Sequence, residues 1–174
     1  MATVSNINLG PSTVTFSGTL GGISYDALDL GAFNEEGVTV TVTTDGIDVA
    51  TDQTGTAPAR VFLGGQSATV TTPMLEETFD LTYLALVGAV SGTGNRIDFG
   101  RKAGYDIAEN WAGQLEIKPI DATRDKFVLH SCIPTGEVSA VYNSTDPYLL
   151  QVEWRALPDT TLADGKQLGF RSSQ

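Results

Sequence analysis

Residues that could carry chemistry are few in this sequence, and His130 and Cys132 are the first pair to consider. They are the one histidine and the one cysteine among the 174 residues. Two positions apart on a predicted strand, they would share one face and could pair or bind a metal together. A structural zinc site takes four nitrogen or sulfur ligands, which one histidine and one cysteine cannot supply. We therefore expect both side chains to pack in an apolar strand and predict no metal site.

Carboxylates gather at two places, and neither pattern predicts a catalytic or metal site. Asp45, Asp48 and Asp52 lie close together, but they lack the regular spacing and the bidentate glutamate of a calcium-binding loop. Glu76 and Glu77 are neighbours, and adjacent helical residues point about 100° apart. The positive end of a helix dipole already explains two acids at a predicted helix start.

The glycine-rich motifs of common enzymes are missing. The sequence has no Gly-x-Ser-x-Gly elbow and no Gly-x-x-x-x-Gly-Lys phosphate loop. Gly92-Thr93-Gly94 has neither a preceding strand nor a lysine to complete such a loop. We therefore predict no enzymatic activity, no catalytic residue and no cofactor.

Alternating residues predict strands in the first half of the chain. The sequence Val38–Thr43 alternates valine with threonine, which is typical of a half-buried strand with the valines inward. Asp45-Gly46 suits a tight turn, so Ile47–Ala50 is expected to run back as its partner. The same reasoning predicts a first strand and a second hairpin around Gly64-Gly65, over residues Thr13–Thr19, Arg60–Leu63 and Ser67–Thr72.

One helix is predicted, over about residues 73–87. Thr72 is a suitable N-cap, Pro73 suits the first helical position, and Gly88 can end the helix. Apolar residues recur there at helical spacing, namely Leu75, Phe79, Tyr83 and Leu86.

The second half again predicts strands. Gly92–Asn110 indicates an exposed loop, and the residues after Thr160 a polar tail anchored by Leu162, Leu168 and Phe170. Between them lie four predicted strands: Gln114–Lys118, Lys126–Cys132, Glu137–Tyr142 and Leu149–Leu157. Together the patterns predict one domain over residues 1–174, with a mobile N-terminal segment and a polar tail over about 160–174. Its fold class is mainly β, an antiparallel β-sandwich or barrel with one flanking helix.

Charge narrows the classes of partner. The chain carries 10 basic and 21 acidic side chains, a net charge of −11. The first 95 residues hold one base, Arg60, against ten acids, so most of the negative charge comes from that part. Such a surface repels a phosphate backbone, which argues against a protein that grips nucleic acid. Two interpretations of the acidic residues stay open. They keep the protein soluble, or they keep one face negative so that an anionic molecule moves past it without binding.

The lone cysteine and the N-terminal residues bear on location. One cysteine cannot form an internal disulfide framework. The opening Met-Ala-Thr-Val-Ser-Asn shows no secretory signal, so Asn143-Ser144-Thr145 is not expected to be glycosylated. The sequence also lacks an apolar run long enough to cross a membrane, and we expect no membrane anchoring.

The order of these elements resembles a known family. A Gly-Val-(Thr-Val)-Thr hairpin is followed by Asp52-Gln53-Thr54-Gly55, a second hairpin and the amphipathic stretch Leu75–Leu84. Val152-Glu153-Trp154-Arg155-Ala156-Leu157-Pro158-Asp159 then precedes a polar tail. Over residues 35–160 this order is similar to that of the major tail tube protein of long-tailed bacteriophages, a family that also resembles the type VI secretion tube protein.

The resemblance implies a virion protein that assembles in the host cytoplasm. Its copies would form stacked, hexameric rings around a channel through which DNA passes during ejection. Partners would be further copies of the chain, tail-tip and tail-terminator proteins and a length-determining protein. We expect no C-terminal immunoglobulin-like domain of the kind that some members carry, and no inter-ring loop aligns.

Candidate contact residues follow from this resemblance. Asp45, Asp48 and Asp52 would face the lumen or a neighbouring ring. Arg96, Arg101 and Lys102 would pair with acids of an adjacent copy.

The alternative is a β-sandwich attachment or binding module, such as a tail-tip, decoration or carbohydrate-binding domain. Exposed aromatic residues often form the binding sites of such folds. Trp111 and Tyr105 are the candidate pair in this sequence.

Overall fold

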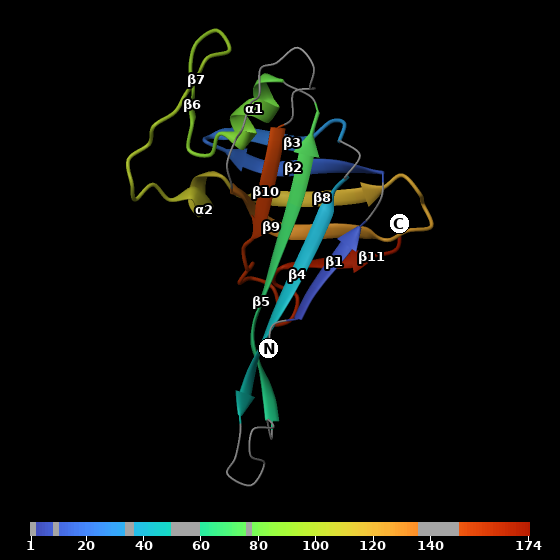
Figure 1. Ribbon diagram of the computed structural model, residues 1–174. Coiled ribbons are helices and arrows are strands. Elements are labelled where there is room, and N and C mark those ends of the chain that lie inside the picture. Colours follow the sequence, from blue (N-terminus) through green and yellow to red (C-terminus); the bar gives the residue numbers. More distant parts are fainter. Residues whose placement is uncertain (1–2, 9–10, 34–36, 50–59, 76–77, 136–149) are drawn as a thin grey trace.

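The chain folds as a mainly antiparallel β-sandwich with a flanking helix (Figure 1). The computed structural model describes residues 3–8, 11–33, 37–49, 60–75, 78–135 and 150–174. Along the chain the elements of the described residues are β1 (Thr3–Asn8), β2 (Ser12–Leu20), β3 (Ile23–Asp29), β4 (Thr39–Val49), β5 (Arg60–Met74), α1 (Phe79–Ala85), β6 (Val90–Ser91), β7 (Ile97–Asp98), α2 (Ile107–Asn110), β8 (Gly113–Pro119), β9 (Lys126–Thr135), β10 (Leu150–Ala156) and β11 (Gly169–Ser172).

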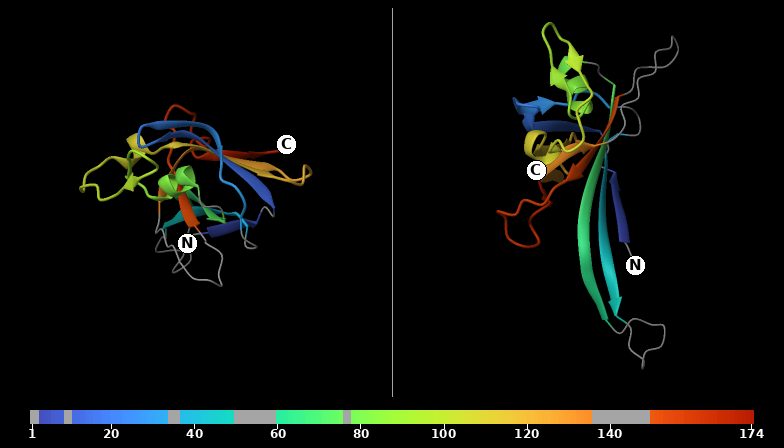
Figure 2. Two further views of the ribbon diagram at one scale, coloured as in Figure 1. Left: turned by 90° about the horizontal axis from the view of Figure 1, so that it is seen from above. Right: turned by 90° about the vertical axis from the view of Figure 1, so that its left-hand side faces the viewer.

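Nine of the strands in the described residues form one sheet that folds over on itself. Its strand order is β1-β4-β5-β10-β9-β8-β2-β3, and β11 pairs with β9 outside this path. Strands β1, β4, β5 and β10 run across the direction of β9, β8, β2 and β3, so the sheet makes two facing layers (Figures 1 and 2). The core lies between these layers, and α1 lies at one end of the sandwich.

Aromatic rings join the two layers. Phe16 of β2 stacks on Trp154 of β10 with ring centroids 5.2 Å apart, and both side chains are fully buried. Leu150, Val152 and Ala156 are buried beside Trp154, whereas Gln151, Glu153 and Arg155 are exposed. The strand predicted over Leu149–Leu157 is confirmed, and its residues alternate strictly between the core and the solvent.

The prediction for the helix is right in existence and wrong in extent. Thr72 and Pro73 belong to β5, where they pair with Val152 and Gln151. The helix begins at Phe79 instead, and the side chain of its N-cap, Thr78, accepts a hydrogen bond from the backbone of Leu81. Residues 72–74 are buried against the core, and this burial outweighs the tendency of Thr-Pro to start a helix.

The two hairpins predicted in the first half are wrong, because β4 and β5 form one longer hairpin. Its register runs from Thr39↔Thr71 to Val49↔Arg60, and a bulge falls at Asp45/Gly46. The apolar residues that follow Asp45-Gly46 continue β4 rather than returning beside it, and Gly64 is absorbed as the extra residue of the bulge. Residues 50–59, which connect the two strands, lie outside the described residues, as does the predicted strand Glu137–Tyr142.

The segments predicted to be irregular contain further elements. The predicted loop Gly92–Asn110 holds strand β7, which pairs with β6, and helix α2. The predicted polar tail contains strand β11, which pairs with β9. Leu168 of the tail packs against the core as expected, whereas Phe170 is exposed and contacts the ring of His130.

Candidate assembly surface

The distal part of the β4–β5 hairpin projects well beyond the sandwich (Figures 1 and 2). We call this part the arm and define it as residues Asp45–Val49 and Arg60–Gly65. The two strands are paired along the whole arm, from Asp45↔Gly65 to Val49↔Arg60. No other strand of the described residues pairs with either arm strand, so the arm is a two-stranded ribbon. Such a ribbon is marginally stable in water unless something packs against it.

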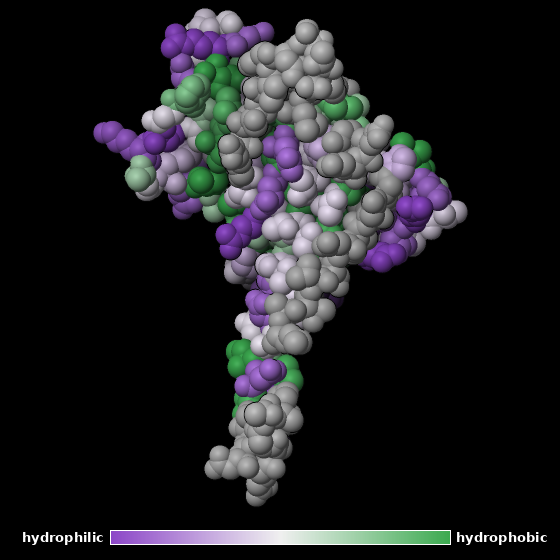
Figure 3. Space-filling model, viewed as in Figure 1, coloured by the Kyte–Doolittle hydropathy of each residue, from purple (hydrophilic) through white to green (hydrophobic). Residues whose placement is uncertain are grey.

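The arm exposes more large apolar side chains than any other element of the described residues. Ten such side chains are exposed in the part of the chain that the structure describes, and five of them belong to the arm. Their exposed fractions reach 66%, and they form the green cluster near the lower end of the molecule in Figure 3: Ile47 56%, Val49 41%, Val61 63%, Phe62 53% and Leu63 66%. Concentrations of exposed apolar side chains are typical of interaction surfaces.

Both faces of the arm are apolar. On the face that continues the core side of the sheet, the paired residues are Gly46↔Leu63 and Asp48↔Val61. On the opposite face they are Ile47↔Phe62 and Val49↔Arg60. We call these the inner and the outer face. Because a strand normally alternates apolar with polar residues when one face meets water, this ribbon is suited to burial on both sides.

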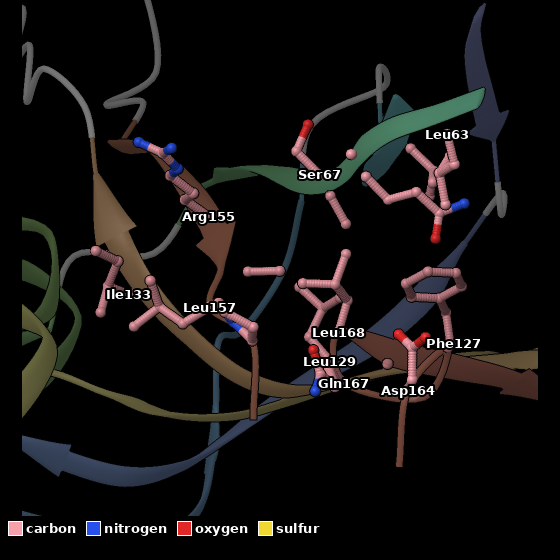
Figure 4. A pocket seen from close by; sticks show the side chains of 18 residues that line it. Leu63, Ser67, Phe127, Leu129, Ile133, Arg155, Leu157, Asp164, Gln167 and Leu168 are labelled. Atoms are coloured by element: carbon pink, nitrogen blue, oxygen red, sulfur yellow. The ribbon is translucent and has the colours of Figure 1, made fainter. Parts of the chain in front are cut away.

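A groove of about 550 Å³ lies at the base of the arm, below its inner face (Figure 4). It opens between β5 and the segment that follows β10. The side chains along it are mostly apolar and include Leu63, Phe127, Leu157 and Leu168. Asp164 is the acidic residue among those that line it, and Arg155 borders it from the solvent face of β10 (Figure 4).

Two of the three acids predicted as lumen or ring contacts lie on the arm. Asp45 and Asp48 are exposed, and they occupy opposite faces because they are separated by an odd number of positions along β4. They therefore do not form one carboxylate cluster. Asp52 lies outside the described residues. The sequence pattern does not single out Val61, Phe62 and Leu63, because an unbroken apolar run is equally typical of an ordinary buried strand.

The three predicted basic contacts all lie in the segment between α1 and α2. Arg96 forms an ion pair with Asp98 at 2.7 Å. Arg101 donates from Nε to the carbonyl of Gly88 at 3.0 Å, and its guanidinium lies 4.3 Å from the ring centroid of Tyr105. Lys102 is exposed and makes no ion pair within the described residues. Arg96 and Arg101 thus have partners within their own chain, and Lys102 is the basic side chain left for a neighbour.

The aromatic pair of the binding-module alternative is not exposed as expected. Trp111 is fully buried, with its ring centroid 5.2 Å from that of Tyr83. Tyr105 is half-buried beneath Arg101. The prediction that Trp111 and Tyr105 form an exposed binding pair is therefore wrong.

Cys132 and His130 do not share a face. The register of β8 with β9 shifts between Gly113↔Cys132 and Leu115↔Leu129, so β9 bulges and turns Cys132 toward the core beside Leu129. His130 contacts Phe170 instead, with ring centroids 5.4 Å apart. Burial raises the pKa of the Cys132 thiol far above its usual range, which keeps it protonated and unreactive.

The described residues contain no group of three or more histidine, cysteine or acidic side chains placed to hold a metal ion. Glu76 and Glu77 fall outside these residues. None of the helices described is long and apolar enough to span a membrane.

Comparison of the sequence with models of known protein families gives no match, and comparison with curated proteins gives none either. Inferences about function therefore rest on the residues and on the geometry described above.

Proposed function

We propose that this chain is a structural subunit that associates with copies of itself into stacked rings, forming a tube of the kind found in the tails of long-tailed bacteriophages. The observation that carries the proposal is the arm, a projecting ribbon with exposed apolar side chains on both faces. Burying one such side chain contributes about 1.5–3 kcal/mol. The five exposed apolar side chains of the arm therefore favour association of the chain over the monomeric state.

The sheet edges support a role for the arm in particular. Strand β3 forms one edge of the sheet, but its pairing with β2 shifts between Phe16 and Gly18, and Ala27 has a φ of 54°. Irregularities of this kind protect an edge against pairing with another chain. The bulge of the arm lies at its base, at Asp45/Gly46, and beyond it the pairs from Gly46↔Leu63 to Val49↔Arg60 form a regular, apolar ribbon.

The charge supports a conduit for DNA. A net charge of −11 on a chain of 174 residues gives assembled rings a strongly negative field. Phosphate groups would not bind to such a wall, so a duplex could move through the channel. We propose that rings are hexameric and that DNA passes without specific contacts, as the resemblance to tail tube proteins implies.

The test compares two matched double variants with the wild-type chain. Phe62→Ser with Ile47→Ser removes apolar surface from the arm, and Phe99→Ser with Ile120→Ser removes similarly exposed apolar side chains elsewhere. Each chain is concentrated, then examined by negative-stain electron microscopy and by light scattering coupled to size-exclusion chromatography. We expect rings or tubes from the wild type and the control, and particles of 18.4 kDa from the arm variant.

Two results would count against the proposal. If the arm variant assembles as the wild type does, the arm is not the assembly surface. If the wild type stays at 18.4 kDa even when seeded with tail-tip complexes, the chain is not a tube subunit, and the attachment-module alternative gains support.

A further inference from the structure

Each copy of the chain carries both a projecting apolar ridge and an apolar groove. The ridge is the outer face of the arm, formed by Ile47, Val49 and Phe62. The groove lies on the other side of the sheet, at the base of the arm, and continues onto its inner face through Leu63. Because ridge and groove are on opposite sides of the ribbon, a copy cannot fill its own groove with its own ridge.

The ridge and the groove also carry charges of opposite sign. Arg60 lies on the outer face of the arm, where it pairs with Val49. Asp164 is among the residues that line the groove (Figure 4). A base on the ridge of one copy can therefore meet an acid in the groove of another. Neither Arg60 nor Asp164 forms an ion pair within the described residues.

We propose that the outer face of one copy's arm packs into the groove of a neighbouring copy, with Phe62 in the groove and Arg60 beside Asp164. This inference rests on the proposed function and names the contact through which the subunits associate. The contact is heterologous, because it joins two different surfaces of the same chain. It also explains the two-sided apolarity of the arm, since the outer face enters one neighbour while the inner face receives the arm of another.

Charge reversal tests the pairing of Arg60 with Asp164. Arg60→Glu and Asp164→Lys each place like charges together, and each is expected to raise the protein concentration needed for assembly about tenfold. The double variant restores opposite charges and should return this concentration to near the wild-type value. Lys166→Glu, an exposed charge reversal on the same segment as Asp164, is the matched control and should assemble as the wild type does.

Cross-linking gives a readout that does not depend on tubes. Phe62→Cys and Gln167→Cys chains are mixed and treated with a short bis-maleimide, while the buried Cys132 stays unreactive. We expect a covalent dimer that contains one copy of each variant. The control mixture, Phe62→Cys with Ile120→Cys, places the second thiol at an exposed site away from the groove and should yield no such dimer.

The outcomes separate this inference from the proposed function. If tubes form from both charge-reversal variants and the specific cross-link is absent, the arm-in-groove contact is overturned and the proposed tube function is not. The specific cross-link in a chain that never forms rings would support the contact and overturn the tube. A chain that shows neither assembly nor cross-link would overturn both.

Discussion

The indole Nε1 of Trp154 donates a 3.0 Å hydrogen bond to the hydroxyl of Thr72, and this hydroxyl in turn donates to the carbonyl of Val152 at 3.1 Å. Thr72 is the one fully buried polar side chain in the core of the described residues. Its hydroxyl satisfies the only polar atom of the buried indole, so Trp154 lies in the core without an unpaired donor.

Thr72→Val tests this relationship. The substitution keeps the shape of the side chain but leaves the Trp154 Nε1 donor without a partner, so we expect a loss of about 2 kcal/mol in the free energy of unfolding. Guanidinium denaturation followed by tryptophan fluorescence measures it. Thr71→Val, one position along on the half-buried side of β5, is the control, and an equal loss there would show that the hydrogen bond is not responsible.

Gly113 and Gly65 form a second matched pair. A Cβ atom on Gly113 would lie 2.5 Å from both the Phe16 ring and the carbonyl oxygen of Ser17, whereas one on Gly65 would meet nothing within 4 Å. We expect Gly113→Ala to cost about 3 kcal/mol, because the Phe16 ring must leave its stack on Trp154. Gly65→Ala should change the free energy of unfolding by less than about 0.5 kcal/mol. Similar melting temperatures for the two variants would contradict this account.

Tyr25 predicts how stability depends on alkaline pH. Its hydroxyl donates to Asp80 at 2.8 Å, and burial followed by this hydrogen bond raises its pKa above the ordinary 10.0. The folded state thus holds the phenol proton more tightly than the unfolded state. The stabilisation is complete below pH 10 and is lost as the pH rises further.

Tyr25→Phe removes this titration. We expect the variant to be less stable than the wild type at pH 8, since it lacks the bond to Asp80, and to lose less stability between pH 10 and pH 11. Chemical denaturation at these pH values measures both effects. Parallel pH profiles for the two proteins would show that Tyr25 does not titrate with unfolding.

Arg101 and Lys102 are neighbours with different expected roles. Arg101→Ala removes the hydrogen bond to Gly88 and the contact with Tyr105, so amide exchange around residues 88–106 should accelerate about five- to tenfold. Lys102→Ala should leave exchange unchanged, because Lys102 is exposed and forms no ion pair within the described residues. Equal acceleration of exchange in both variants would mean that the Arg101 side chain does not stabilise the segment between α1 and α2.

The sequence predicts the parts of this fold that local pattern determines. Alternation around Trp154 predicts both the strand and its inward face, and the residues after Phe79 are correctly expected to be helical. Asp45-Gly46 misleads because its preference for a turn is weaker than eleven residues of pairing between β4 and β5. Thr72-Pro73 misleads for a similar reason, since burial in the core decides its conformation.

The arm and the groove could not be predicted in the same way. The run Val61-Phe62-Leu63 is equally typical of a buried strand, and only the sheet order shows that no layer covers it. The groove combines residues of β4, β5, β9, β10, β11 and the segment between β10 and β11, which no local pattern relates. Whether an apolar residue is exposed depends on tertiary packing, and the sequence pattern does not report it.

The position of β10 between β5 and β9 has a consequence for how the protein folds. The hydrogen bond from Thr72 to Val152 joins residues 80 positions apart in the sequence. Strands β5 and β10 can therefore pair only after the chain between them has closed into a loop. During synthesis the β4–β5 hairpin can pair early, but the core stays open until β10 leaves the ribosome. Refolding should accordingly be slow, on the order of milliseconds to seconds, because distant segments must meet before their contacts stabilise anything.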